Sequence, residues 1–298
     1  MIKKVDYTFI KLLSPLDLAT ILYMLVSGIY ICFSKADFNT LLPHFAIRIA
    51  ILLLIICLCI AADKYKTNKP LLFLKNLYPL LFLGFFYTET HYMKNIIFDT
   101  NLDAYFYNAE HSLWNCQPSM EFSKLYHQAW VNELMNIFYF SYYVIIGLSC
   151  VVLYLKEAQQ SQKAIFIVVL SFYLYYIVFA VFPVVGPQYH ILNCGIEQNP
   201  PYFFGKLMRY ILTDYEKPTG AFPSSHVGIA IIISYITYTH LKKLFFVTLP
   251  FVIGICFATV YIKAHYLVDV IAGIVSAPIC ILLSGKLYTK FLSYNTKL

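Results

Sequence analysis

The sequence is short of charged residues. Only 12% of its 298 residues are Asp, Glu, Lys or Arg, whereas a typical soluble domain has about 25%. This shortage argues against a water-soluble enzyme and against a disordered chain, because both keep a largely polar surface in contact with water. The lysines are scattered rather than gathered in runs, so the formal net charge of +7 forms no basic stripe. No nucleic-acid partner is therefore expected.

Internal repeats and low-complexity tracts are also missing. Many secondary transporters are built from two related halves, so this absence counts against a transporter. Cysteine is not scarce, with 8 residues, but most of them lie inside apolar stretches, where cysteine packs as a small apolar side chain. Cys116 and Cys194 lie outside those stretches. A disulfide between them and a pair of free thiols are both compatible with the sequence.

Apolar residues are abundant, at 60% of the chain. A helix that crosses a bilayer needs about 20 mostly apolar residues, and about eight stretches qualify. The sequence therefore predicts an all-α fold, a polytopic helical bundle in a membrane. Lys75 and Pro79 interrupt the third span, and Arg48 in the second is expected to snorkel toward the interface. The predicted spans are residues 15–33, 44–62, 70–88, 134–155, 164–183, 226–241, 244–262 and 266–285.

The distribution of lysine predicts the orientation of the bundle. Lysines gather in both termini and in the short segments 63–69, 156–163 and 242–243. By the positive-inside rule, both termini face the cytoplasm. The longer segments 89–133 and 184–225 then lie on the periplasmic, extracellular or lumenal face. A multi-pass protein with its functional site on that face is predicted.

Two clusters of polar residues begin predicted helices on that face. In the first, Gly220–His226, Ser224 or Ser225 could cap the helix that follows, and the free N–H groups at a helix start also suit a phosphate. In the second, His265 and Asp269 are four residues apart and share one helical face. Taken singly, each cluster reads as an ordinary cap or local hydrogen bond. Taken together, two imidazoles and a carboxylate at one interface suit phosphoryl transfer.

These clusters resemble motifs of the type 2 phosphatidic acid phosphatase superfamily. Residues 223–226 match its Pro-Ser-x-His motif, residues 265–269 match its His-x-x-x-Asp motif, and a weak first motif lies at 182–187. Residues 220–226 and 259–269 are similar to the inositol phosphorylceramide synthase-like branch. The resemblance implies a catalytic helical core over residues 134–298. Residues 1–133 would supply N-terminal helices and an outer loop rich in aromatic and acidic side chains.

The resemblance also implies a role for each site residue. His265 would be the nucleophile that forms a phosphohistidine, Asp269 its orienting partner, and His226 the acid that protonates the leaving group. No cofactor or metal is implied. Where phosphatase members carry Lys or Arg, this chain has Gln188 and Thr259. The residues expected to bind the substrate are therefore Ser224, Ser225, Gln188, His190, Lys217 and Lys263.

The leading prediction is a membrane phosphotransferase. By the resemblance, it moves inositol phosphate from a phospholipid donor to a ceramide-like or other lipid acceptor, so membrane lipids are its expected partners. A phosphatase that uses the same residues, with water as the acceptor, is the alternative. Two further interpretations stay open: a proton-coupled transporter with His226, His265 and Asp269 as its relay, and a metal site built from those residues with His190.

Overall fold

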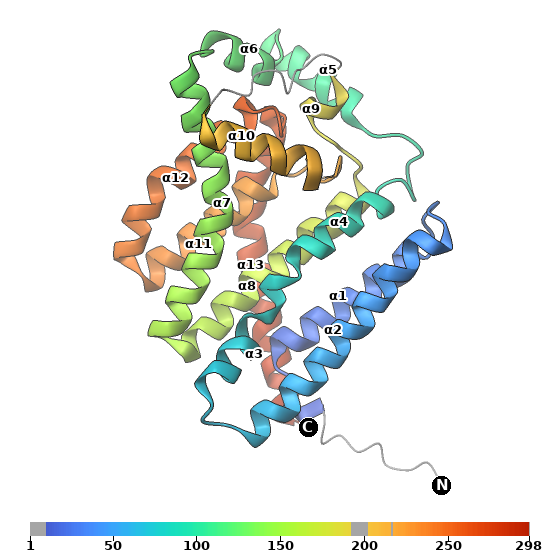
Figure 1. Cartoon of the computed structure of the whole chain (residues 1–298), viewed down its shortest axis with the longest axis vertical. Helices are drawn as coiled ribbons and strands as arrows, with labels where there is room; N and C mark the ends of the chain where they lie inside the picture. The colour runs from blue at the N-terminus through green and yellow to red at the C-terminus, as the bar shows by residue number, and fades with distance from the viewer. Residues whose placement is uncertain (1–9, 192–201, 216, 298) are drawn as a thin grey trace.

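A computed structural model of the chain describes residues 10–191, 202–215 and 217–297. Every element assigned in those ranges is helical, so the predicted all-α fold is confirmed (Figure 1). The elements are η1 (Ile10–Leu12), α1 (Pro15–Ile31), α2 (Phe38–Lys64), α3 (Lys69–Leu81), α4 (Leu83–Met93), α5 (Asp103–Trp114), α6 (Pro118–Leu125), α7 (Ala129–Lys156), α8 (Ala158–Val181), α9 (Pro187–His190), α10 (Phe203–Tyr210), η3 (Ile211–Tyr215), α11 (Ser225–His240), α12 (Lys242–Tyr261) and α13 (Leu267–Lys297).

Six stretches among the described residues are long and apolar enough to cross a membrane: Phe38–Lys64, Lys69–Met93, Ala129–Lys156, Ala158–Val181, Lys242–Tyr261 and Leu267–Ser293. The spans predicted at 15–33 and 226–241 form shorter helices, because α1 has 17 residues and α11 has 16. At about 1.5 Å per residue each is about 25 Å long, against about 30 Å for the hydrocarbon core. The chain is thus a multi-pass membrane protein with six clear spans. Its orientation stays a prediction.

The span predicted at 70–88 consists of two helices. α3 ends at Leu81 and α4 begins at Leu83. Pro79 has no N–H to donate within the helix, and this lost hydrogen bond favours a break nearby. Lys75 on α3 is buried in an ion pair with Asp17 of α1, so its charge is neutralised inside the bundle.

The prediction that Arg48 snorkels is wrong. Its guanidinium donates to both oxygens of Glu89 on α4, at 2.6 Å and 3.2 Å. It also donates to the carbonyl of Met24 on α1 at 2.6 Å. Because this carboxylate lies within the bundle, the charge is neutralised there and need not reach the interface.

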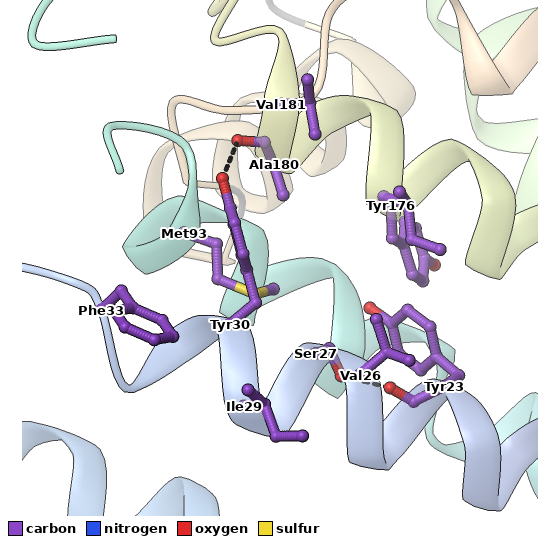
Figure 2. Close-up of a pocket in the computed structure, with 11 residues that line it drawn as sticks. Tyr23, Val26, Ser27, Ile29, Tyr30, Phe33, Met93, Tyr176, Ala180 and Val181 are labelled. Atoms are coloured by element: carbon purple, nitrogen blue, oxygen red, sulfur yellow. Dashed lines mark hydrogen bonds between the residues drawn. The ribbon is translucent and has the colours of Figure 1, made fainter. Parts of the chain in front are cut away.

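Helix α8 is the centre of the bundle. In its most apolar window 72% of the residues are buried, whereas the figure for α2 at the edge is 28%. Figure 2 shows the contact of α1 with α8, where the Tyr30 hydroxyl donates to the Ala180 carbonyl at 3.4 Å. This bond lies beside an apolar pocket of about 190 Å³. Nearby, the rings of Tyr23 and Tyr173 stack with their centroids 4.2 Å apart, so aromatic packing joins the two helices.

The helices of the two long predicted loops gather at one end of the molecule. Figure 1 shows α5, α6, α9 and α10 together at this end, whereas α1 begins and α13 ends near the opposite end. Helices α5 and α6 come from segment 89–133, and α9 and α10 come from segment 184–225. The described parts of these loops therefore form one helical cap over the ends of α7, α11, α12 and α13.

Candidate active site

The first site histidine, His226, lies in the first turn of α11. Ser224 is the N-cap of this helix, and its hydroxyl oxygen accepts the N–H of Val227 at 3.4 Å. The N–H of Ser224 donates to the backbone carbonyl of Asp269 at 3.0 Å. This bond joins the start of α11 to the start of α13, so it brings the two sequence motifs together.

The second histidine, His265, lies in the turn between α12 and α13. Its Nε2 is 3.2 Å from Nδ1 of His226. Its Nδ1 is 2.8 Å from the carbonyl oxygen of Ala221 and 3.7 Å from Oδ2 of Asp269. The structure therefore brings His226, His265 and Asp269 together in one buried cluster. Within it, the nearest partner of His265 Nδ1 is the Ala221 carbonyl rather than the carboxylate.

The Ala221 carbonyl determines which nitrogen of His265 carries the proton. A carbonyl oxygen can only accept, so Nδ1 donates to it and Nε2 keeps its lone pair. Nε2 then accepts a hydrogen bond from Nδ1 of His226 across the 3.2 Å contact. An unprotonated imidazole nitrogen can act as a nucleophile, and a neighbouring ring that carries a proton can act as the general acid.

Asp269 holds the turn as well as facing His265. Its Oδ2 accepts the N–H of Tyr266 at 2.8 Å. Its Oδ1 is buried and has no hydrogen-bond partner among the described residues. A carboxylate 3.7 Å from an imidazole is too far for a hydrogen bond and near enough to stabilise a positive charge on the ring.

Two tyrosines of α7 flank the ring of His226. The ring centroids lie 4.7 Å from Tyr139 and 4.3 Å from Tyr142. Both tyrosines are buried. Sequence reasoning did not single them out, although their spacing of three residues places them on one face of a helix beside the outer segment. They restrict the orientation of the imidazole.

Asp103 on α5 holds the loop of the weak first motif. Its carboxylate accepts the N–H groups of Val185 and Gly186, the latter at 2.8 Å, and the hydroxyl of Tyr266 at 3.3 Å. Burial raises the pKa of this carboxyl, and the hydrogen bonds oppose the rise. Gly186 has a φ of +93°, and a Cβ there would lie 2.4 Å from the Ala264 carbonyl oxygen. Only glycine lets this loop pack against the turn that carries His265.

Glu110, also on α5, caps the helix that carries Asp269. One of its oxygens accepts the N–H groups of Leu267 and Val268 at the start of α13. The side chain is completely buried. Burial raises the pKa of Glu110 to about 7, and the nearby charge of Asp269 adds to the rise, while the two backbone hydrogen bonds oppose it. Sequence reasoning missed both acids of α5, although seven residues separate them and two helical turns place them on the same face.

A small polar space lies between the histidines and the loops. Gln188, Thr219, Gly220, His226 and His265 are among its lining residues. Its volume of about 10 Å³ is enough for about one water molecule. None of the described lining residues is Lys or Arg. A phosphoryl group therefore needs the two rings to move apart before it can enter.

The residues predicted to bind the substrate are only partly gathered around this space. Gln188 lines it, and its N–H donates to the Lys263 carbonyl at 2.9 Å. Lys263 is buried with a φ of +67°, whereas His190 and Lys217 are exposed and do not line it. Ser224 is engaged as a helix cap, and Ser225 lines a larger neighbouring groove with His226.

Lys94 is a buried cation near the site that sequence reasoning also missed. It follows α4, and its Nζ donates to the Pro218 carbonyl at 2.5 Å. Thr219 and Gly220, the next two residues, line the polar space. Burial lowers the pKa of Lys94, and the negative charge of Asp103 opposes this. The lysine thus positions the loop before the Pro-Ser-x-His motif.

Two further expectations concern cysteine and metal. Cys194 lies outside the described residues, so the pairing of Cys116 with Cys194 stays a prediction. In the part of the chain that the structure describes, no group of three or more His, Cys, Asp and Glu side chains is arranged to hold a metal ion. The alternative of a metal site at His226, His265 and Asp269 therefore finds no support in the described geometry.

Comparison with known proteins identifies the family of the chain. The family model of the PAP2 superfamily matches residues 105–283. A PA-phosphatase related-family protein of Dictyostelium discoideum is 31% identical over 118 residues, which cover 37% of this chain and 21% of that protein. The match thus spans about a fifth of the relative's length. No solved structure matches the chain.

Proposed function

The chain belongs to the PAP2 superfamily, and from this premise we propose that it is a membrane phosphotransferase that works through a phosphohistidine. Membership supports a phosphatase-type enzyme. The proposed reaction moves a phosphoryl head group, inositol phosphate by the resemblance of the motifs, from a phospholipid to the hydroxyl of a ceramide-like or other lipid acceptor. The site would act at the periplasmic, extracellular or lumenal face.

The observation that carries this proposal is the 3.2 Å contact between His265 Nε2 and His226 Nδ1. In the first step, the lone pair on Nε2 attacks phosphorus, the N–P bond forms and the P–O bond to the leaving group breaks. With the anionic substrate bound, His226 enters this step as an imidazolium protonated on both nitrogens; it gives one proton to the leaving oxygen and becomes a neutral imidazole. The phosphorylated imidazole is positively charged, and Asp269 at 3.7 Å stabilises that charge. In the second step, His226 takes the proton of the acceptor hydroxyl, whose oxygen displaces His265 from phosphorus.

The two rings must separate before the substrate binds. They are in hydrogen-bond contact, and the adjoining space holds about 10 Å³. Since the Ala221 carbonyl anchors His265 at 2.8 Å, the ring of His226 is the one expected to move. Its neighbours Tyr139 and Tyr142 would then change position with it.

The shortage of cations favours a phosphodiester donor over a phosphomonoester. The described residues that line the polar space include no Lys or Arg. A diester carries one negative charge, whereas a monoester near neutral pH carries between about 1.5 and 2. Fewer positive groups are needed to bind the diester.

Hydrolysis is the second candidate. The Dictyostelium relative is named as a PA-phosphatase related-family protein. The same two histidines would serve if water replaced the lipid hydroxyl. The reactions differ only in the acceptor, so they are separated by their products.

Trapping of the intermediate tests the proposal. Purified protein is incubated with a phospholipid donor labelled in its phosphate, quenched and analysed for label that is acid-labile and base-stable. Wild type should carry the label on His265, and His265→Ala should carry none. His240→Ala serves as the matched control, because His240 lies at the opposite end of α11 and does not line the polar space; it should be labelled as wild type is. Label in His265→Ala would refute the nucleophile. Separation of the water-soluble head-group phosphate from new labelled lipid distinguishes hydrolysis from transfer.

A further inference from the structure

A large apolar groove adjoins the polar space. It lies between α3, α4, α7, α8 and α11 and has a volume of about 370 Å³, within the usual range of about 300–1,000 Å³ for small-molecule sites. Hydrocarbon and aromatic side chains make up most of its wall. They include Leu80, Leu83, Tyr142, Ile146, Phe172 and Tyr176.

The groove and the polar space meet at His226. The ring of His226 and the side chain of Tyr87 line both. The hydroxyl of Tyr87 donates to the Thr219 carbonyl at 3.0 Å, which fixes Tyr87 at the boundary. A molecule whose phosphate reaches the histidines can therefore extend its apolar part into the groove without crossing the protein.

The other end of the groove faces the expected hydrocarbon core of the membrane. Leu81 and Tyr143, which line it, are 71% and 39% exposed. They belong to the stretches Lys69–Met93 and Ala129–Lys156, both long and apolar enough to span a membrane. Exposed apolar residues on such helices contact lipid, so the groove opens sideways toward acyl chains.

Two glycines line this groove on opposite helices. Gly84 is on α4 and Gly147 is on α7. A Cβ added at either position would meet no atom within 4 Å, so close helix packing does not require glycine there. Glycine inside a helix is less stable than alanine. What these residues provide is space in the groove.

We propose that this groove binds the hydrocarbon chain of the lipid whose phosphate reacts at the histidines, and that Gly84 and Gly147 set the chain it accepts. The inference rests on the proposed function and adds a specificity site to it. Two of the helices that line the groove, α3 and α4, lie outside residues 105–283, the range matched by the family model. Chain selectivity is therefore built partly from residues N-terminal to the family domain.

Leucine substitutions in the groove test this inference. Gly84→Leu and Gly147→Leu fill the groove, and Gly285→Leu is the matched control, because a Cβ at Gly285 on α13 also meets nothing within 4 Å and Gly285 does not line the groove. Turnover is measured with a long-chain diacyl phospholipid in micelles and with its water-soluble short-chain analogue. Displacing about two methylenes from the groove should raise KM for the long-chain lipid about tenfold.

The two substrates and a binding assay separate the outcomes. The short-chain KM and the long-chain KM of Gly285→Leu should stay close to wild type. An unchanged long-chain KM in both groove variants, or an equal rise in KM with both substrates, would overturn the inference that these glycines set the chain. A long-chain phosphonate with a diazirine on its chain labels the groove without turnover. If wild type turns over no substrate but is labelled in the groove, and Gly84→Leu is not labelled, the proposed function is refuted and chain binding in the groove is supported. If wild type is not labelled, chain binding in the groove is refuted.

Discussion

Glu110→Gln tests whether the Glu110 carboxyl, on α5 in the helical cap, makes the stability of the protein depend on pH. Glu110 is buried, its carboxylate accepts two N–H groups at the start of α13, and burial raises its pKa from 4.5 to about 7. The folded protein thus binds this proton more tightly than the unfolded chain. The resulting stability is fully present below about pH 4.5 and is lost as the pH rises through about 7.

The size of this effect follows from the shift. A rise from 4.5 to about 7 corresponds to about 3 kcal/mol, of which about 2 kcal/mol is lost between about pH 5.5 and 8. For a chain of 298 residues, that equals a fall in Tm of about 3 °C. Gln cannot ionise, and its carbonyl oxygen can still accept from the backbone of α13. The Tm of Glu110→Gln should therefore change much less over this range.

The assay is thermal unfolding in detergent at both pH values. Wild type, Glu110→Gln and a control, Glu121→Gln, are compared; Glu121 is an exposed acid on α6 that pairs with Lys124. The control should follow wild type. Equal falls in Tm for wild type and Glu110→Gln would refute the assignment of this pH dependence to Glu110.

Three further substitutions have expected outcomes. Asp269→Asn should lower kcat by about ten- to a hundredfold, as measured by steady-state kinetics. The loss should be smaller than the roughly 10⁴-fold loss in a triad whose carboxylate fixes the histidine tautomer. The reason is that the Ala221 carbonyl, 2.8 Å from His265 Nδ1, fixes the tautomer here. Gly186→Ala, with a φ of +93° and a Cβ 2.4 Å from a carbonyl oxygen, should lower Tm in thermal unfolding. Arg48→Met removes the guanidinium from the buried Glu89, whose other basic neighbour is His44 at 3.3 Å. This change should cost about 3–5 kcal/mol, whereas the double variant with Glu89→Gln should recover much of the lost Tm.

Most of the correct predictions about the site came from local sequence motifs. The position of His226 at a helix start, and of His265 and Asp269 in the next turn, follows from short-range patterns and from the order of apolar stretches. The partner of His265 Nδ1 does not follow from them. The i,i+4 spacing pointed to Asp269, but the nearest acceptor is the backbone carbonyl of Ala221, 44 residues away. Side-chain patterns do not show where a backbone oxygen will lie.

The residues that sequence reasoning missed act across long distances in the chain. Asp103 reaches a loop 82 residues away, and Glu110 reaches a helix start 157 residues away. Their one local signal was a seven-residue spacing on α5, which indicates a shared helical face but no partner. The same limit explains the error at Arg48, because its partner Glu89 is 41 residues away. A charged residue in an apolar stretch is expected to snorkel only if no residue of opposite charge packs against it in the fold.

These distant contacts connect the N-terminal helices to the chemistry. The ion pair of Arg48 with Glu89 fastens α2 to α4, and the pair of Asp17 with Lys75 fastens α1 to α3. Helix α4 in turn provides Tyr87 at the mouth of the polar space, and Lys94, directly after it, holds the Pro218 carbonyl. The histidines and the carboxylate belong to the family domain, but one side of their surroundings is built by residues before it. Loosening either ion pair should therefore disturb the groove as well as the fold, and long-chain substrates should be affected more than short-chain ones.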